Sequence, residues 1–176
     1  MIKYIKINIL SILLLFVITT SSFSCNYRIA NFGVKPDAIK LDPPPITFPD
    51  AFGGKTMVIP LEAICPNETN LLGSTVNLLF VDDQMISLKL ERANQNDKKL
   101  MDLAMKQFGT FVIPESVDKK NWRGTYTWDK PNEFIMYSSF NIPQGEVEII
   151  KIENKQYMKQ FIEYEKKIEE WLNSQK

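Results

Sequence analysis

Short segments of regular hydrophobic periodicity fill the chain from about residue 55 onward. Alternation of apolar and polar residues, with many β-branched and aromatic side chains, is typical of half-buried strands. Turn-forming residues such as Asp82-Asp83-Gln84 and Lys130-Pro131-Asn132-Glu133 separate these segments. The pattern predicts strands at 56–61, 75–81, 85–90, 110–113, 122–128, 134–139 and 145–152.

Two segments instead show the spacing of helices. Between Asp97, a natural N-cap, and Gly109, a stop signal, apolar residues recur every three or four positions. A second helix is predicted from Asn154 to about Asn173. Its apolar stripe, which we expect to pack on the sheet, consists of Tyr157, Phe161, Tyr164, Ile168, Trp171 and Leu172, with Met158 and Ile162 at its margin.

The order of these elements predicts an α+β fold. Three strands precede the first helix, and up to four strands precede the second, giving the order βββα then ββββα. Short connections favour an antiparallel sheet, which we expect to contain about five to seven strands with both helices packed on it. We assign residues 55–176 to this single globular domain.

A proline-rich stretch precedes the first of these strands. Consecutive prolines enforce an extended, stiff polyproline II conformation. We therefore predict that residues 25–54 form an extended tether. Its prolines are Pro36, Pro43, Pro44, Pro45 and Pro49.

The beginning of the chain has the pattern of an export signal. Lys3 and Lys6 are followed by an apolar run over 7–18 and by mostly small polar residues over 19–24. The apolar run is shorter than the roughly 20 residues that a membrane-spanning helix needs. We predict that residues 1–24 form a signal peptide, cut before Cys25.

The signal segment and Cys25 resemble those of a bacterial lipoprotein. This resemblance implies that Cys25 becomes an acylated, palmitate-bearing N-terminus on the periplasmic or outer face of the cell envelope. Cys65 would then have no partner within the chain. The alternative is ordinary signal peptidase cleavage, which would give a soluble periplasmic or secreted protein. In that case a Cys25–Cys65 disulfide becomes available, because exported proteins occupy oxidising compartments.

Composition narrows the classes of function. The sequence carries 21 basic and 21 acidic residues, and loss of Lys3 and Lys6 with the signal leaves the mature part slightly acidic. This balance disfavours a nucleic-acid partner, which needs a basic surface. The chain has no histidine, so Ser-His-Asp and Cys-His catalysis and the usual zinc sites are excluded. We expect no cofactor, no metal site and no enzymatic activity.

The candidate binding residues are aromatic. Trp122, Tyr126 and Trp128 share one face of a predicted strand, with Arg123 on the other face and Tyr137 on the neighbouring strand. Aligned rings stack on sugars or anchor a protein partner, although the same alternation is also typical of a strand's core face.

Two acidic residues of the strand at 145–152 are also of interest. Glu146 and Glu148 share one face of this strand, and we interpret them as part of a solvated sheet face.

These observations favour a non-catalytic envelope lipoprotein that presents a protein-binding domain, such as an assembly accessory, an inhibitor or an immunity protein. A carbohydrate- or peptidoglycan-binding module using Trp122, Tyr126 and Trp128 is the alternative. A hydrolase based on two carboxylates is less favoured, because it requires a facing pair across a cleft.

Overall fold

One antiparallel sheet of seven strands organises the protein, in the order β1-β2-β3-β4-β7-β6-β5. The computed structural model describes residues 25–93 and 96–175. This architecture confirms the predicted α+β class with an antiparallel sheet. The strands are β1 (Ile46–Pro49), β2 (Gly54–Pro60), β3 (Ser74–Val81), β4 (Gln84–Ala93), β5 (Gly124–Asp129), β6 (Glu133–Ile142) and β7 (Gly145–Asn154).

The described part of the chain contains three α-helices, which differ in role. α2 (Leu61–Ile64) is a single turn after β2, α3 (Lys99–Phe108) lies against the sheet, and α4 (Met158–Ser174) follows β7. Short 3-10 turns connect these elements at Pro36–Ala38, Thr69–Leu71, Lys119–Asn121 and Lys155–Tyr157. Asn154 caps the last of these turns, where its side chain accepts a hydrogen bond from the Gln156 amide at 2.9 Å.

The predicted order is wrong in three details. β1 forms within the segment assigned to the tether, since proline is tolerated on an edge strand. The predicted strand at 110–113 does not form, and Phe111 instead packs its side chain into the core. The short helix α2 was not predicted, because its Leu61–Ile64 sequence is too brief to show a helical period.

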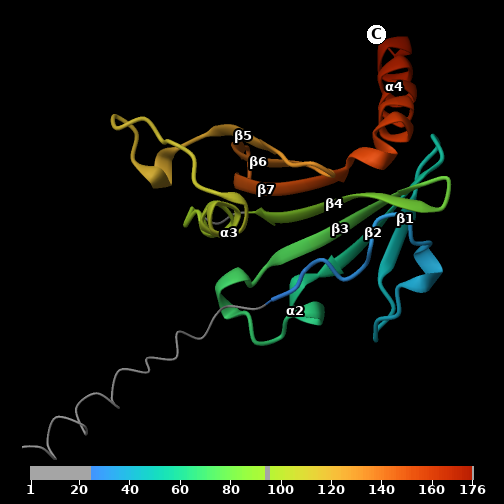
Figure 1. The fold of residues 1–176 in the computed structure, drawn as a ribbon, viewed down its shortest axis with the longest axis horizontal. Coiled ribbons are helices and arrows are strands. Elements are labelled where there is room, and N and C mark those ends of the chain that lie inside the picture. The colour runs from blue at the N-terminus through green and yellow to red at the C-terminus, as the bar shows by residue number, and fades with distance from the viewer. Residues whose placement is uncertain (1–24, 94–95, 176) are drawn as a thin grey trace, which may run out of the picture.

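The main hydrophobic core lies on one face of the sheet. Alternate residues of the strands supply its floor, including Val76 and Leu78 of β3, Leu88 and Leu90 of β4, and Ile150 of β7. Helix α3 covers this face through Leu100, Met101, Leu103 and Ala104, and the N-terminal segment and α2 complete the cover (Figure 1).

The N-terminal segment differs from the tether that the prolines suggested. Tyr27 is buried in the main core, and its hydroxyl donates a hydrogen bond to Gln107 of α3 at 2.5 Å. Further along, Gly33 donates to the Met85 carbonyl at 2.8 Å, and the Met85 amide donates to Val34 at 2.9 Å. These hydrogen bonds, and the packing of the segment's apolar residues on the main core, hold residues 25–41 on the domain.

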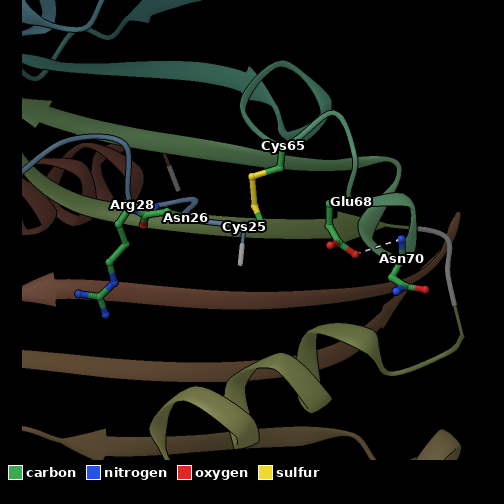
Figure 2. The surroundings of a disulfide bond; sticks show 6 residues. All are labelled: Cys25, Asn26, Arg28, Cys65, Glu68 and Asn70. Carbon is green, nitrogen blue, oxygen red and sulfur yellow. Dashed lines mark hydrogen bonds between the residues drawn. A yellow bond between two sulfur atoms is a disulfide. The ribbon is translucent and has the colours of Figure 1, made fainter. Parts of the chain in front are cut away.

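A disulfide between Cys25 and Cys65 fixes the start of this segment (Figure 2). Cys65 directly follows α2, so the bond ties the first described residue to the end of that helix. Both cysteines pack against the main core. Of the two alternatives for Cys25 left open by the sequence, the structure contains the disulfide.

The opposite face of the sheet carries mostly polar residues. Lys89 pairs with Glu91 at 2.7 Å, and Lys151 pairs with Glu153 at 2.6 Å, in each case along one strand. Antiparallel sheets commonly leave one face to water in this way. The two sheet edges are β1, which ends at Pro49, and β5, whose exposed Thr125-Tyr126-Thr127 run contains no proline.

Helix α4 packs on the sheet along part of its length. Figure 1 shows it rising away from the end of the sheet. Tyr164 is its one buried residue, in a second small core with Val81 and Ile86. The expectation that the whole apolar stripe packs on the sheet is therefore wrong.

No helix within residues 25–93 and 96–175 is long and apolar enough to cross a membrane. The predicted signal peptide, 1–24, lies outside the described residues.

Removal of the disulfide is expected to destabilise the domain. The bond joins residues separated by 40 positions, so it restricts the unfolded chain substantially. We expect Cys65→Ser to lower the free energy of unfolding by about 2 to 4 kcal/mol, as measured by urea denaturation. The double variant Cys25→Ser/Cys65→Ser should match the single one, since both lack the same bond. An unchanged denaturation midpoint after reduction would contradict this expectation.

Candidate functional site

A cluster of charged and polar side chains is buried beneath the beginning of α3. It contains Lys98, Ser139, Glu146 and Glu148, which are all buried, and the partly exposed Arg123. We call these five residues the polar cluster. Glu146 and Glu148 were expected on a solvated face, and this interpretation is wrong. α3 and Lys98 cover the face that carries them. Ile150 and Ile152 alternate onto this same face of the strand, which is the signal that the face belongs to the core.

Glu148 of β7 holds the first turn of α3. Its carboxylate accepts hydrogen bonds from the backbone amides of Met101 at 3.0 Å and Leu100 at 3.4 Å. These amides belong to the group that a helix leaves unpaired at its N-terminus, where a negative charge is also favourable. The Tyr137 hydroxyl donates to the same carboxylate at 2.7 Å. Burial, reinforced by the Glu148 charge, raises the pKa of Tyr137.

Glu146 neutralises Lys98. The Lys98 ammonium forms an ion pair with the Glu146 carboxylate and donates to Ser139 Oγ at 2.6 Å. Ser139 Oγ donates in turn to Glu146 at 2.6 Å, and Arg123 pairs with the second carboxylate oxygen at 3.0 Å. Lys98 itself has a left-handed backbone (φ 55°), which directs the chain into α3.

The polar cluster is closed to a substrate. A serine beside a lysine of lowered pKa is one way to build a nucleophile. Burial, followed by the charge of Arg123, lowers the pKa of Lys98 to about 8, against the opposing effect of Glu148. However, Lys98 is 0% exposed and Ser139 is 1% exposed, and each is satisfied by its neighbours. This geometry supports a structural role.

The structure brings the predicted aromatic residues together. Trp122, Tyr126, Trp128 and Tyr137 form one cluster around Phe111, which stacks on Tyr126 with ring centroids 4.6 Å apart. Trp122 also stacks on Tyr137 at 5.8 Å. Phe111, from the connection between α3 and β5, is the member that sequence reasoning missed. The prediction of a strand at 110–113 did not indicate that Phe111 would contact the other four rings.

Most of these rings pack against one another and leave little ring surface open to solvent. Trp128 and Tyr137 are buried, and the Trp128 indole donates to the Gly109 carbonyl at 3.0 Å. Tyr126 is 37% exposed, but one side of its ring is occupied by Phe111. Arg123 binds Glu146 and Asn141 and does not join the rings.

Large apolar side chains are exposed on α4 and on the edge strand β1. Trp171 and Leu172 on α4 are 50% and 51% exposed, and Ile46 and Phe48 on β1 are 64% and 55% exposed. Phe52, in the turn after β1, lies edge-to-face with Trp171 at 5.8 Å between ring centroids. We call these five residues the apolar face.

The apolar face lies on the side of the sheet that α4 occupies. Phe48 pairs with Thr56, and Thr56 pairs with Leu79, which packs in the small core under α4. Directly paired residues of an antiparallel sheet point to the same face. The Tyr164 hydroxyl donates to Asp50 at 2.5 Å and joins α4 to the chain between Phe48 and Phe52.

Comparisons with protein-family models, curated proteins and solved structures found no match for this chain. Its own residues are therefore the basis for a functional assignment. Within residues 25–93 and 96–175, no group of three or more acidic or cysteine side chains is placed to hold a metal ion. Because the polar cluster is closed and the apolar face is open, the apolar face is the candidate functional site.

The Lys98–Glu146 pair provides a test of the structural role. We expect Glu146→Leu to lower the free energy of unfolding by about 3 to 5 kcal/mol, because it leaves a buried ammonium without its counter-charge. The double variant Lys98→Met/Glu146→Leu should recover at least about 2 kcal/mol of this loss. Urea denaturation at pH 7 measures both changes in the free energy of unfolding.

The exposed pair Lys159–Glu163, 3.9 Å apart on α4, is the matched control. Glu163→Leu should change the stability by less than about 0.5 kcal/mol. A double variant less stable than Glu146→Leu alone would show that the pair is not the origin of the effect.

Proposed function

We propose that this protein is an exported, non-catalytic binding domain whose apolar face docks another protein. The exposure of Trp171, Leu172, Ile46 and Phe48 supports this proposal most directly. Large apolar groups that gather on one surface, especially around a tryptophan, are typical of protein–protein contacts. An assembly accessory, an inhibitor and an immunity protein all work by this kind of contact.

The geometry of α4 fits insertion into a groove of the partner. The hydrogen bond from Tyr164 to Asp50 holds the first half of α4 on the domain. The last turns of the helix carry Trp171 and Leu172 beyond the sheet. An amphipathic helix that docks in a groove uses anchors three, four and seven positions apart. Tyr164, Ile168, Trp171 and Leu172 have this spacing. The first two pack in the small core, so Trp171 and Leu172 are the members of this stripe that are free to act as anchors.

A protein is a better occupant of the apolar face than a membrane surface. The polar side of α4 carries the acidic residues Glu163, Glu165, Glu169 and Glu170 against Lys159, Lys166 and Lys167. Binding to anionic lipid requires an excess of basic residues beside the apolar stripe. The helix has the opposite balance.

A carbohydrate-binding function at the aromatic cluster has less support. Sugar recognition by stacking needs a ring face open to solvent. The buried Trp128 and Tyr137 offer none, and Phe111 occupies one side of Tyr126. A hydrolase at Glu146 and Glu148 has less support as well, because both carboxylates are buried among protein partners.

We further propose that the exported protein carries the Cys25–Cys65 disulfide and is soluble in the periplasm or secreted. A sulfur atom in a disulfide has no bond left for a lipid, so the lipid-anchored and disulfide-bonded forms exclude each other. The burial of Tyr27 and the packing of Cys25 on the core favour the disulfide-bonded form. A disulfide also agrees with export, since it persists in oxidising compartments.

Substitutions on the apolar face are expected to weaken partner binding. The variant Trp171→Ala/Leu172→Ala should retain less than about a tenth of the partner captured by the wild type, because truncation of central anchors costs 2 kcal/mol or more. The readout is the stoichiometry of protein co-purified from solubilised cell envelopes, followed by titration with the purified partner.

Val112→Ala is the matched control, because Val112 is an apolar residue 91% exposed on the connection between α3 and β5. It should bind as the wild type does, and all variants should unfold at similar temperatures. Failure to recover any stoichiometric partner, or equal capture by the face variant, would contradict the proposed function.

The intact mass of the mature protein tests the state of Cys25. We expect a chain that begins at Cys25, carries no lipid, and takes up two alkyl groups after reduction but none before it. This result follows from a disulfide between its two cysteines. A mass increase matching acyl chains plus glycerol would instead establish the lipid-anchored form and place the protein at a membrane.

A further inference from the structure

A polar cavity of about 340 Å³ lies on the core side of the sheet, away from the apolar face. Its walls come from the N-terminal segment around Asn31, the turn before β6 at Asn132, and the end of β7 with the 3-10 turn that follows. This volume is at the lower end of the range for small-molecule sites. None of the five residues of the apolar face lines this cavity.

The lining combines partly exposed aromatic rings with an amide-rich rim. Phe32 and Tyr157 supply the rings, whereas Met85, Leu88 and Ile152 are at most 1% exposed and lie behind the cavity wall. The rim carries the side-chain amides of Asn31, Asn132, Asn154 and Gln156. Each amide group can donate and accept hydrogen bonds. Such a lining suits a ligand that has many neutral polar groups and a small apolar part.

The charges at the cavity cancel. Arg28 and Glu133, the charged residues among its lining, form an ion pair at 2.7 Å. The Arg28 side chain extends away from the disulfide (Figure 2). No uncompensated basic residue lines the cavity to attract a phosphate or a carboxylate, and one glutamate does not make a cation site. The balance favours an uncharged ligand.

Backbone contacts hold the rim in place before a ligand arrives. The Lys155 amide donates to the Asn132 carbonyl at 2.9 Å and joins the two turns that carry rim amides. At the third wall, the backbone of Gly33 lies so close to Tyr157 that an added Cβ would come within 2.1 Å of its hydroxyl. The φ of +86° at Gly33 also favours glycine, so this close contact depends on that residue. A pre-organised rim lowers the entropy cost of binding.

We propose that this cavity binds an N-acetylated sugar. Hydroxyl groups of a sugar ring both donate and accept, as the rim amides do. The acetamido group adds an amide that pairs with an asparagine side chain, and a methyl group. Phe32 and Tyr157, the partly exposed aromatic residues of the lining, offer apolar surface to this methyl group and to the sugar ring. This site is separate from the proposed protein-docking face.

Titration of the full mature protein with N-acetylglucosamine and its β-1,4-linked disaccharide tests this proposal. Two-dimensional NMR should show shifts of the side-chain amides of Asn31, Asn132, Asn154 and Gln156 that saturate with the sugar. Glucose, which lacks the acetamido group, should bind at least about fivefold more weakly, because it loses a hydrogen bond and an apolar contact.

Asn31→Ala and Asn132→Ala should each weaken binding of the N-acetylated sugars about fivefold to tenfold, since each removes hydrogen bonds to the ligand. Asn121→Ala, at an exposed asparagine outside the cavity lining, should bind as the wild type does. Thermal unfolding of each variant checks that the fold is retained. Absence of saturable shifts, shifts centred on Trp122 and Tyr126, or unchanged binding by both rim variants would each overturn the proposal.

Discussion

The fold depends on the burial of two β7 carboxylates under the beginning of α3. Glu148 accepts the free amides of the helix, and Glu146 neutralises Lys98, the residue that turns the chain into it. α3 covers the core face together with the N-terminal segment and α2, so its position decides how this part of the core is closed. A buried ion pair adds little net stability, but it is costly to break. The pair therefore specifies where α3 starts.

This arrangement separates the parts of the molecule by function. The end of the sheet near α3 is closed by charged groups that satisfy one another. The other end carries α4 and exposes large apolar side chains, and the N-terminal segment shapes a cavity between its own turn and the turns beside β6 and β7. The apolar face and the cavity therefore both lie outside the polar cluster.

Local periodicity predicted most of the strands and both long helices, because strands and helices follow from neighbouring residues. It did not predict the role of Glu146, whose partner Lys98 is 48 positions away. The prolines of residues 25–54 concealed β1 and the apolar contacts around Tyr27. Four aromatic members of the cluster were identified from strand alternation, but Phe111 was not, since its contact comes from a connection without regular structure.

The two sheet edges differ in a way that limits self-association. β1 begins after Pro45 and ends at Pro49, and a proline has no amide hydrogen to offer a new strand. β5 presents an exposed run without proline at the other edge. Growth of a sheet into a fibre requires two receptive edges on every copy. With one receptive edge, strand pairing between copies through β5 ends at a closed dimer, so the asymmetry of the two edges opposes growth into a fibre.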